Sequence, residues 1–212
     1  LIDQNGLEEF SIRALARSLK VFPTALYCHF GGAKADLIAD VSGRLLANLM
    51  RRDEIQPDWQ DTLRLLFRRF RKRLHQHPNF APAFGAQIRS NGAPNAPWVE
   101  IVLTALTTAG YSGKPLVDAF NALLGGVEGF ITMELATMPP KGSDFVSDFQ
   151  SGLRGLDAES YPLTVRHLPD MLNRSFVLRW KNGAHAPLDG GFEFLLEALL
   201  ASIKARAPQA IS

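Results

Sequence analysis

Few side chains in this sequence have the type and spacing that chemistry would need. His75 and His77 lie two positions apart in a stretch with helical periodicity, and imidazole nitrogens are common metal ligands. Residues two positions apart on a helix point in nearly opposite directions, so these two cannot share an ion. The glycines of residues 125–129 follow no predicted strand, which argues against a phosphate-binding loop, and no G-x-S-x-G, H-E-x-x-H or C-x-x-C motif is present. The sequence therefore predicts no enzyme, no metal and no cofactor.

The stretch from Ser11 to Phe30 carries the strongest functional signal. Ser11 is a suitable N-cap, and apolar residues recur behind it at helical spacing up to Leu19. Pro23 suits the first turn of a second, shorter helix, and Val21 is expected to plug the turn between the two. Two short helices around a tight turn can place the second helix in the major groove of DNA. The side chains expected to face outward from the second helix are those of Thr24, Ala25, Tyr27 and Cys28.

Composition sets wide limits on the kind of protein. The chain has 212 residues, of which 46% are hydrophobic, so it can bury a substantial core. The net charge of +2 neither requires nor excludes a nucleic-acid partner. A single cysteine, Cys28, excludes an internal disulfide and fits a reducing compartment, so we expect a cytoplasmic protein. Four polar residues interrupt the most apolar stretch, 116–138, which argues against a membrane partner.

Nearly every periodic segment has helical spacing, so we predict an all-α chain. The Pro-containing stretch 55–58 is the expected boundary between a domain of residues 1–54 and a domain of residues 55–212. Leu1 falls within a helical segment, and we expect that helix to begin upstream. Residues 139–162, rich in Pro, Gly, Ser and Asp, are expected to form a long connection. The longer predicted helices are the one that carries Leu63–Leu74 on its inner side, and those at about 34–52, 98–109, 115–138, 163–181 and 188–206.

The helix around residues 63–74 has a strongly basic outer side. We interpret this side as a solvated face, because charge runs on amphipathic helices commonly face water. Additional contact with DNA or with a membrane is the alternative. Its members are Arg64, Arg68, Arg69, Arg71, Lys72 and Arg73.

The stretch from Ser11 to Phe30 resembles the DNA-binding signature of the tetracycline-repressor (TetR) family. The matching positions are Ser11–Leu19, Val21, Pro23, Ala25–Tyr27, His29–Phe30 and Lys34. The rest of the chain resembles the family more loosely, at Gly129-Phe130, Met133–Ala136, Tyr161-Pro162 and Phe192–Phe194. The resemblance implies a three-helix head with a helix-turn-helix, followed by a larger helical domain for ligand binding and dimerisation.

The resemblance also implies roles for individual residues of the head. Tyr27 and His29 would hydrogen-bond phosphates, and Lys34 with the N-terminus of its helix would hold another phosphate. Ser11 and Arg13 would approach the DNA backbone from the first helix of the motif. Thr24 would contact a base edge or a thymine methyl group.

Three positions depart from the family pattern. Lys20 stands where the family has glycine, at a turn position that needs positive φ, which costs a non-glycine residue about 1 kcal/mol. Lys20 could offset this cost by contacting a phosphate. One additional residue separates His29 from Lys34, and Phe22 replaces the usual serine cap. These departures keep open the alternative of a small-molecule-binding helical protein with weak or no sequence-specific DNA binding.

The family resemblance implies a ligand cavity in the larger domain, and such cavities are largely apolar. No charged residue lies clearly on an inward stripe there, so the expected effector is small, lipophilic, and neutral or weakly polar. The expected lining residues are Phe70, Phe84, Gln87, Trp98, Phe120, Asn121, Phe130, Thr132 and Met133.

The final helix carries apolar residues on more than one side, and a two-fold dimer would bury them. We expect this helix and the helix at about 115–138 to pair with their copies as a four-helix bundle. The expected interface residues are Gly125, Gly129, Leu195, Leu196, Leu199 and Ile203. The predicted function is ligand-controlled repression of transcription from a near-palindromic double-stranded DNA operator.

Overall fold

The computed structural model describes residues 1–29, 33–84, 97–140 and 142–208 of the chain, and this part contains helices but no strand. This confirms the all-α prediction. The helices of the N-terminal part are α1 (Ile2–Asn5), α2 (Ile12–Leu19), α3 (Pro23–His29), α4 (Lys34–Leu46) and the 3-10 turn η1 (Arg52–Glu54). Those that follow are α5 (Trp59–Gln76), η2 (Pro78–Ala83), α6 (Pro97–Thr108), α7 (Gly113–Glu134), α8 (Phe145–Arg154), α9 (Pro162–Met171) and α10 (Asp189–Arg206).

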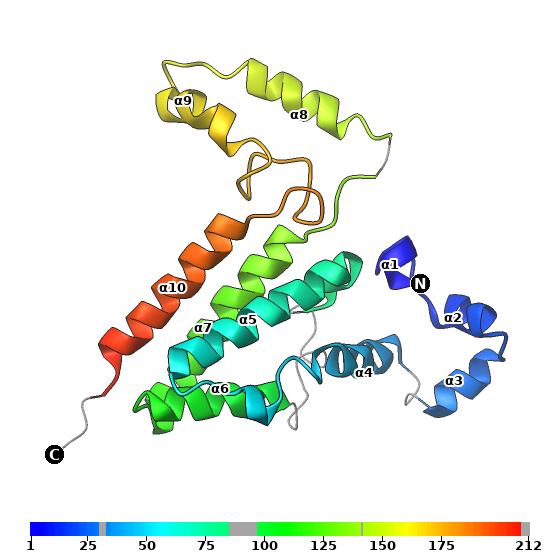
Figure 1. Ribbon diagram of the computed structural model, residues 1–212. Coiled ribbons are helices and arrows are strands. Elements are labelled where there is room, and N and C mark those ends of the chain that lie inside the picture. The colour runs from blue at the N-terminus through cyan, green and yellow to red at the C-terminus, as the bar shows by residue number, and fades with distance from the viewer. Residues whose placement is uncertain (30–32, 85–96, 141, 209–212) are drawn as a thin grey trace.

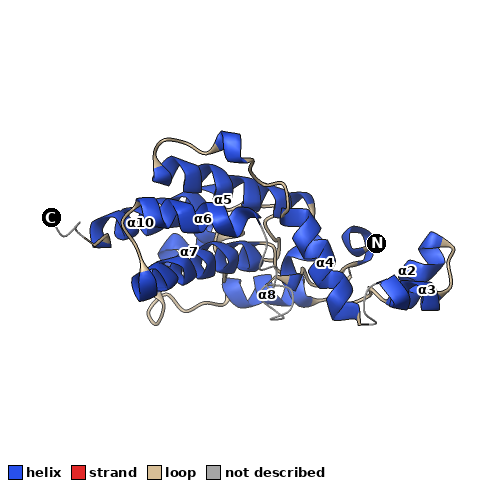
Figure 2. Ribbon diagram, turned by 90° about the horizontal axis from the view of Figure 1, so that it is seen from below, coloured by secondary structure: helices blue, strands red, loops and turns tan. Residues whose placement is uncertain are grey.

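The helices form a bundle with a head at one end. Helices α5, α6, α7 and α10 pack together, while α2 and α3 lie apart from them at the end of α4 (Figure 1). A second view shows α2 and α3 at the opposite end of the molecule from the C-terminus (Figure 2). Helices α8 and α9 lie one after the other beyond the end of α7 and the start of α10 (Figure 1). The head is therefore free to approach a large partner without obstruction by the bundle.

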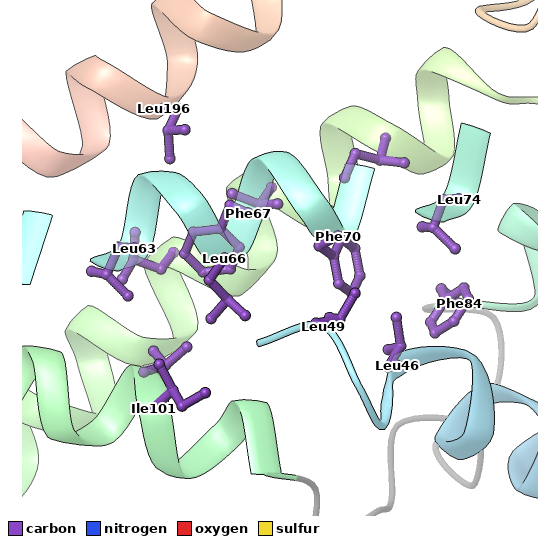
Figure 3. Packing of buried hydrophobic residues seen from close by; sticks show 14 of the residues in the cluster. Leu46, Leu49, Leu63, Leu66, Phe67, Phe70, Leu74, Phe84, Ile101 and Leu196 are labelled. Carbon is purple, nitrogen blue, oxygen red and sulfur yellow. The ribbon is translucent and has the colours of Figure 1, made fainter. Parts of the chain in front are cut away.

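Helix α5 is the central element of the core. The Asp58 side chain caps it by accepting a hydrogen bond from the Gln60 N–H, and its apolar residues then recur at helical spacing. Leu63, Leu66, Phe67, Phe70 and Leu74 are all buried. Figure 3 shows this stripe facing Leu46 and Leu49 from the end of α4, Ile101 from α6 and Leu196 from α10. The core thus reaches the end of the head's last helix without a break.

Several helix ends differ from the sequence prediction. Helix α4 ends at Leu46 and α7 at Glu134, earlier than expected, and α8 lies inside the predicted connection 139–162. The predicted helix 163–181 ends at Met171: Leu172 is already extended, and Asn173 after it is left-handed with φ of 56°. The Asn173 amide oxygen accepts hydrogen bonds from the N–H groups of Trp180 and Lys181, which folds this segment into a compact loop instead.

By length and composition alone, α7 could cross a membrane. This is weak evidence, because the core helices of globular domains pass the same test. Here α7 packs against α5, α6 and α10, with Leu123, Val127 and Ile131 fully buried among them.

Candidate nucleic-acid interface and effector domain

Helix α2 and the turn after it have the backbone that the sequence predicts. Ser11 caps α2 by accepting a hydrogen bond from the Ala14 N–H at 3.1 Å, and its hydroxyl proton can still be donated to another group. Ala16 is 1% exposed, as expected for a small residue between crossing helices. Lys20 lies in the left-handed region with φ of 56°, which confirms that this position needs positive φ.

Two apolar residues near the turn are not buried as predicted. Val21 is 42% exposed and therefore does not plug the turn. Leu19 is 55% exposed, although it was expected on the inner stripe of α2. Its side chain borders an open groove of about 720 Å³ between the head and the end of α5. Helical periodicity thus identified the inner side of α2 correctly, but Leu19 on that side faces an open groove and has little to pack against.

The outer side of α3 carries the expected polar residues. Thr24, Ala25 and Tyr27 are exposed, whereas Leu26 is buried and seats the helix on the head. Arg13 in α2 and Lys20 in the turn before α3 are also exposed. The side chains of Cys28 and His29, and residues 30–32, lie outside the described part of the chain. The described residues thus present a short helix with its hydrogen-bonding groups toward solvent.

Lys34 has a different partner from the one predicted. Its ammonium donates a hydrogen bond to the carbonyl oxygen of Leu7 at 3.0 Å and lies 5.6 Å from the centre of the Phe10 ring. A partly buried ammonium held in this way braces α4 against the segment between α1 and α2. This bond uses one of the three N–H donors of Lys34, so its phosphate contact stays a prediction beside this role in holding the head together.

The residues predicted to line the ligand cavity lie in three different environments. Phe70 and Phe84 are buried and pack edge to face, with ring centres 6.1 Å apart. Trp98 and Phe120 are partly buried against the same core. The Phe130 ring packs on Phe176 and Phe192 and borders a separate pocket of about 360 Å³ near the start of α10.

The polar residues predicted for this cavity do not join its aromatic residues. Asn121 is exposed, and Met133 is 51% exposed, so neither is enclosed within the chain. The Thr132 hydroxyl donates to the carbonyl oxygen of Glu128 in its own helix. Gln87 lies outside the described residues. No pocket formed by the described residues unites the predicted set.

Glu134 contradicts the expectation that no charged residue faces inward. Its side chain is completely buried at the end of α7 and accepts two hydrogen bonds from Arg71, at 2.6 and 2.9 Å. The Nε2 atom of His75 lies 3.1 Å from the same carboxylate, and the Leu188 N–H donates to it at 2.7 Å. We call Glu134 and these three partners the buried node. It also excludes a side chain at position 183, because a Cβ on Gly183 would collide with Glu134.

The pKa values of two α7 carboxyl groups are shifted in opposite directions. Burial alone would raise the pKa of Glu134, but hydrogen bonds from Arg71, His75 and the Leu188 N–H outweigh it and lower the pKa to about 2. Burial raises the pKa of Glu128 to about 7, and no ion pair to Glu128 exists among the described residues. Glu134 is therefore a fixed anion, whereas Glu128 gains or loses its proton near neutral pH.

The arginines of α5 are paired and do not form a free basic patch, and the predicted solvated face is confirmed only in part, at the exposed Arg68 and Lys72. One edge of the helix contacts the start of α10 and the end of α7. Arg64 bonds Glu197 through two nitrogens at 2.7 and 2.8 Å, and Arg68 bonds Glu193 in the same way. Arg71 adds Asp189 to its contacts with Glu134. We call Arg64, Arg68, Arg71 and His75 the bundle edge.

The other edge of α5 contacts the head and the linker. Arg73 donates to the Leu45 carbonyl oxygen at 2.8 Å, and Arg69 donates to the Leu49 carbonyl oxygen and to both oxygens of Glu54. The Nδ1 atom of His77, directly after α5, lies 2.7 Å from the Asp3 carboxylate in α1. We call Arg69, Arg73 and His77 the head edge. It occupies backbone carbonyls that the end of α4 leaves without helical partners.

The predicted dimer interface needs correction at two residues. Leu196 is completely buried and Ile203 is 6% exposed within a single chain, so both belong to the core. Gly126 faces α10: a Cβ there would lie 2.8 Å from a Leu199 methyl carbon, so the end of that leucine side chain would have to move. Gly125 and Gly129, in contrast, have open space where a Cβ would stand.

The protein-family model described as the tetracyclin repressor-like C-terminal domain matches residues 53–207 of the chain. The chain belongs to the TetR family. A curated family member, the class A tetracycline repressor protein from transposon 1721 of Escherichia coli, is 30% identical over 171 residues, which cover 77% of this chain and 71% of that protein. An HTH-type transcriptional regulator from Saccharopolyspora erythraea is 28% identical over 170 residues, covering 80% and 70%.

Solved structures agree with TetR membership. A putative transcriptional regulator from Streptomyces coelicolor A3(2) superposes with a TM-score of 0.69 at 25% identity, covering 98% of this chain and 93% of that one. The S. coelicolor TetR family protein ActR, in complex with (S)-DNPA, shares the fold with a TM-score of 0.71 at 22% identity and the same coverage. The chain is thus a TetR family transcriptional regulator.

Proposed function

We propose that this TetR family member is a ligand-responsive repressor that binds a near-palindromic operator as a homodimer. The observation that carries the proposal is the outer side of α3, where Thr24 and Tyr27 are exposed, with Arg13 of α2 and Lys20 of the turn exposed as well. A short helix seated by one buried leucine, with polar groups facing out, suits the major groove of DNA. The proposed division of labour is residues 1–54 for DNA and residues 55–212 for effector and dimer.

The contacts to DNA follow from the exposed groups. Arg13 and Lys20 supply charge to phosphates, and the hydroxyl groups of Ser11 and Tyr27 donate to phosphate oxygens. We keep His29 as a further phosphate ligand, on the strength of the family signature. Thr24 contacts a base edge or a thymine methyl group.

The proposed dimer forms on the exposed sides of α7 and α10. Gly125 and Gly129 leave the α7 backbone open to close approach, and Phe194 on α10 is 79% exposed. Leu195 and Leu199 are partly buried beside this surface. A two-fold axis here would bury Phe194 and bring two heads onto successive major grooves. Light scattering of the full chain at micromolar concentration should show a dimer, and a monomer would contradict this assembly.

The proposed effector is a small lipophilic molecule bound between α5, α6 and α7, near Phe70, Phe84, Trp98 and Phe120. Because Arg71 and Glu134 neutralise each other, this pair requires no charged ligand. Glu128, half-buried and titrating near neutrality, offers one hydrogen-bonding group. Aromatic walls with a single polar group favour a planar, weakly polar molecule. Such a ligand should raise the melting temperature and, by linkage, lower operator affinity.

Binding to duplexes selected from a random library tests the DNA contacts. Tyr27→Ala should weaken binding to all sequences to a similar extent, because a phosphate carries no sequence information. Lys20→Ala should make the log-log salt dependence shallower by about one unit for the one phosphate that it no longer neutralises. Arg154→Ala, on exposed α8 far from the head, is the matched control. Unchanged binding by both Tyr27→Ala and Lys20→Ala would overturn the docking mode.

A further inference from the structure

Phe22 has the highest exposure of any large apolar side chain in the described part of the chain, at 81%. None of the described aromatic rings packs against it. An isolated exposed phenyl ring keeps its full hydration cost until a partner covers it. The position of Phe22 in the head indicates which kind of partner covers its ring.

The position of Phe22 is fixed at the leading end of α3. Its carbonyl oxygen accepts a hydrogen bond from the Ala25 N–H at 3.0 Å, and Pro23 directly after it begins the helix. Thr24 and Ala25, exposed on the first turn, follow it. In helix-turn-helix proteins the N-terminal residues of the second helix contact base edges. A helix that enters the groove in this way carries the Phe22 ring in with it.

The chemistry of the ring selects among base pairs. A phenyl ring neither donates nor accepts a conventional hydrogen bond, so it would desolvate the polar major-groove edges of guanine, cytosine or adenine without compensation. Thymine alone presents a methyl group in the major groove. The serine that the family signature places here could bond a phosphate or a polar edge, but it would bury far less apolar surface on a methyl group.

We propose that Phe22 determines operator specificity by packing its ring against the methyl group of one thymine in each half-site. This inference rests on the proposed function, because it requires α3 to enter the major groove. The contact would make this chain prefer T·A at a position where relatives with serine have no such requirement. Thr24 and the phosphate contacts act beside it and are independent of it.

The test uses the full chain and an operator selected by the wild-type protein from a library of random duplexes. Each thymine of the selected operator is replaced in turn by deoxyuridine, which removes the methyl group and keeps every hydrogen-bonding group. One thymine per half-site should show about fourfold weaker binding on replacement, the effect expected for one buried methyl group. Phe22→Ala removes this contact from both half-sites of the homodimer, so it should weaken binding to the thymine operator about sixteenfold, the product of two fourfold effects.

The decisive result is the coupling between the two changes. In Phe22→Ala the thymine and deoxyuridine operators should bind equally, and Phe22→Leu should restore part of the difference. Leu163→Ala, which truncates an apolar side chain 67% exposed on α9, should leave the difference unchanged. A deoxyuridine penalty that persists in Phe22→Ala would overturn the inference, as would the absence of any penalty. If the library yields no selected duplex at all, the proposed function fails instead.

Discussion

The two edges of α5 use the same residue types for different kinds of contact. The bundle edge meets carboxylates, including the completely buried Glu134, and joins α5 to α7 and α10. The head edge meets backbone carbonyls at or just after the end of α4 and two carboxylates, the partly buried Glu54 and the half-exposed Asp3. Buried ion pairs are costly to break, whereas exposed ones contribute little. Among these pairs of the described residues, only Arg71–Glu134 is strongly buried, so we expect this pair to hold the bundle in one arrangement, while the head is attached by bonds that can be exchanged.

The largest expected effect comes from breaking the buried node of the bundle edge. Glu134→Ala would leave Arg71 partly buried without its main partner, which should lower the free energy of unfolding by about 3–5 kcal/mol. Denaturant unfolding followed by circular dichroism measures this. Glu193→Ala, which removes an exposed partner of the same edge, should cost about 1 kcal/mol or less. Equal losses in the two variants would show that burial does not distinguish the pairs.

Acid should act on the same node. The folded pKa of Glu134 is about 2, below its ordinary value of 4.5, so its contribution to stability is fully present above pH 4.5. That contribution is lost as the pH falls from 4.5 toward 2, where the folded state must also take up the proton. Stability curves measured against pH should be flatter in this interval for Glu134→Gln than for the wild type. Parallel curves would contradict the assigned pKa.

A smaller and more local effect is expected at the head edge. Arg73→Met removes the bond to the Leu45 carbonyl oxygen while keeping an unbranched side chain against α4, and should cost about 1.5–3 kcal/mol. The cost should appear as faster amide hydrogen exchange in the last turn of α4, with little change in α10. Lys72→Met, the exposed neighbour on α5, is the control and should change exchange in neither helix. Faster exchange throughout the bundle would mean that the two edges are not separable.

The smallest effect tests the exposed pairs of the bundle edge. A double-mutant cycle on Arg68 and Glu193 should give a coupling of about 0.2–1 kcal/mol, since both side chains are near half exposed. The coupling should decrease further at high salt, where exposed charges are screened. A salt-independent coupling well above this range would place the pair with Glu134 in the rigid part of the molecule.

The sequence predicted the features that depend on local spacing. The Ser11 cap, the left-handed Lys20 and the buried stripe of α5 follow from neighbouring residues alone, and the structure confirms them. Contacts between segments that are distant in the sequence could not be predicted in this way. Glu134 finds its partners about 60 residues earlier and 54 residues later, so no local pattern could mark it as buried.

From the sequence, it was equally hard to decide which apolar residues of α10 belong to the core of one chain and which to a dimer interface. Leu196 and Ile203 looked available for a dimer because α10 carries more apolar residues than one stripe needs. Periodicity alone does not tell which of two apolar sides meets the same chain. Helix α8 was missed for a related reason: none of its residues is buried, so no inner stripe distinguishes it from a connection.

The absence of buried residues in α8 and α9 has a consequence for the evolution of this chain. Segments whose side chains contact little of the core can lengthen or shorten at small energetic cost. The path from α7 to α10 is fixed at both ends, by Glu134 and by Leu188, which are hydrogen-bonded to each other. Insertions within α8 and α9 would therefore leave the geometry of α5, α10 and the head unchanged. Related sequences can therefore differ in length here while the rest of the molecule keeps its arrangement.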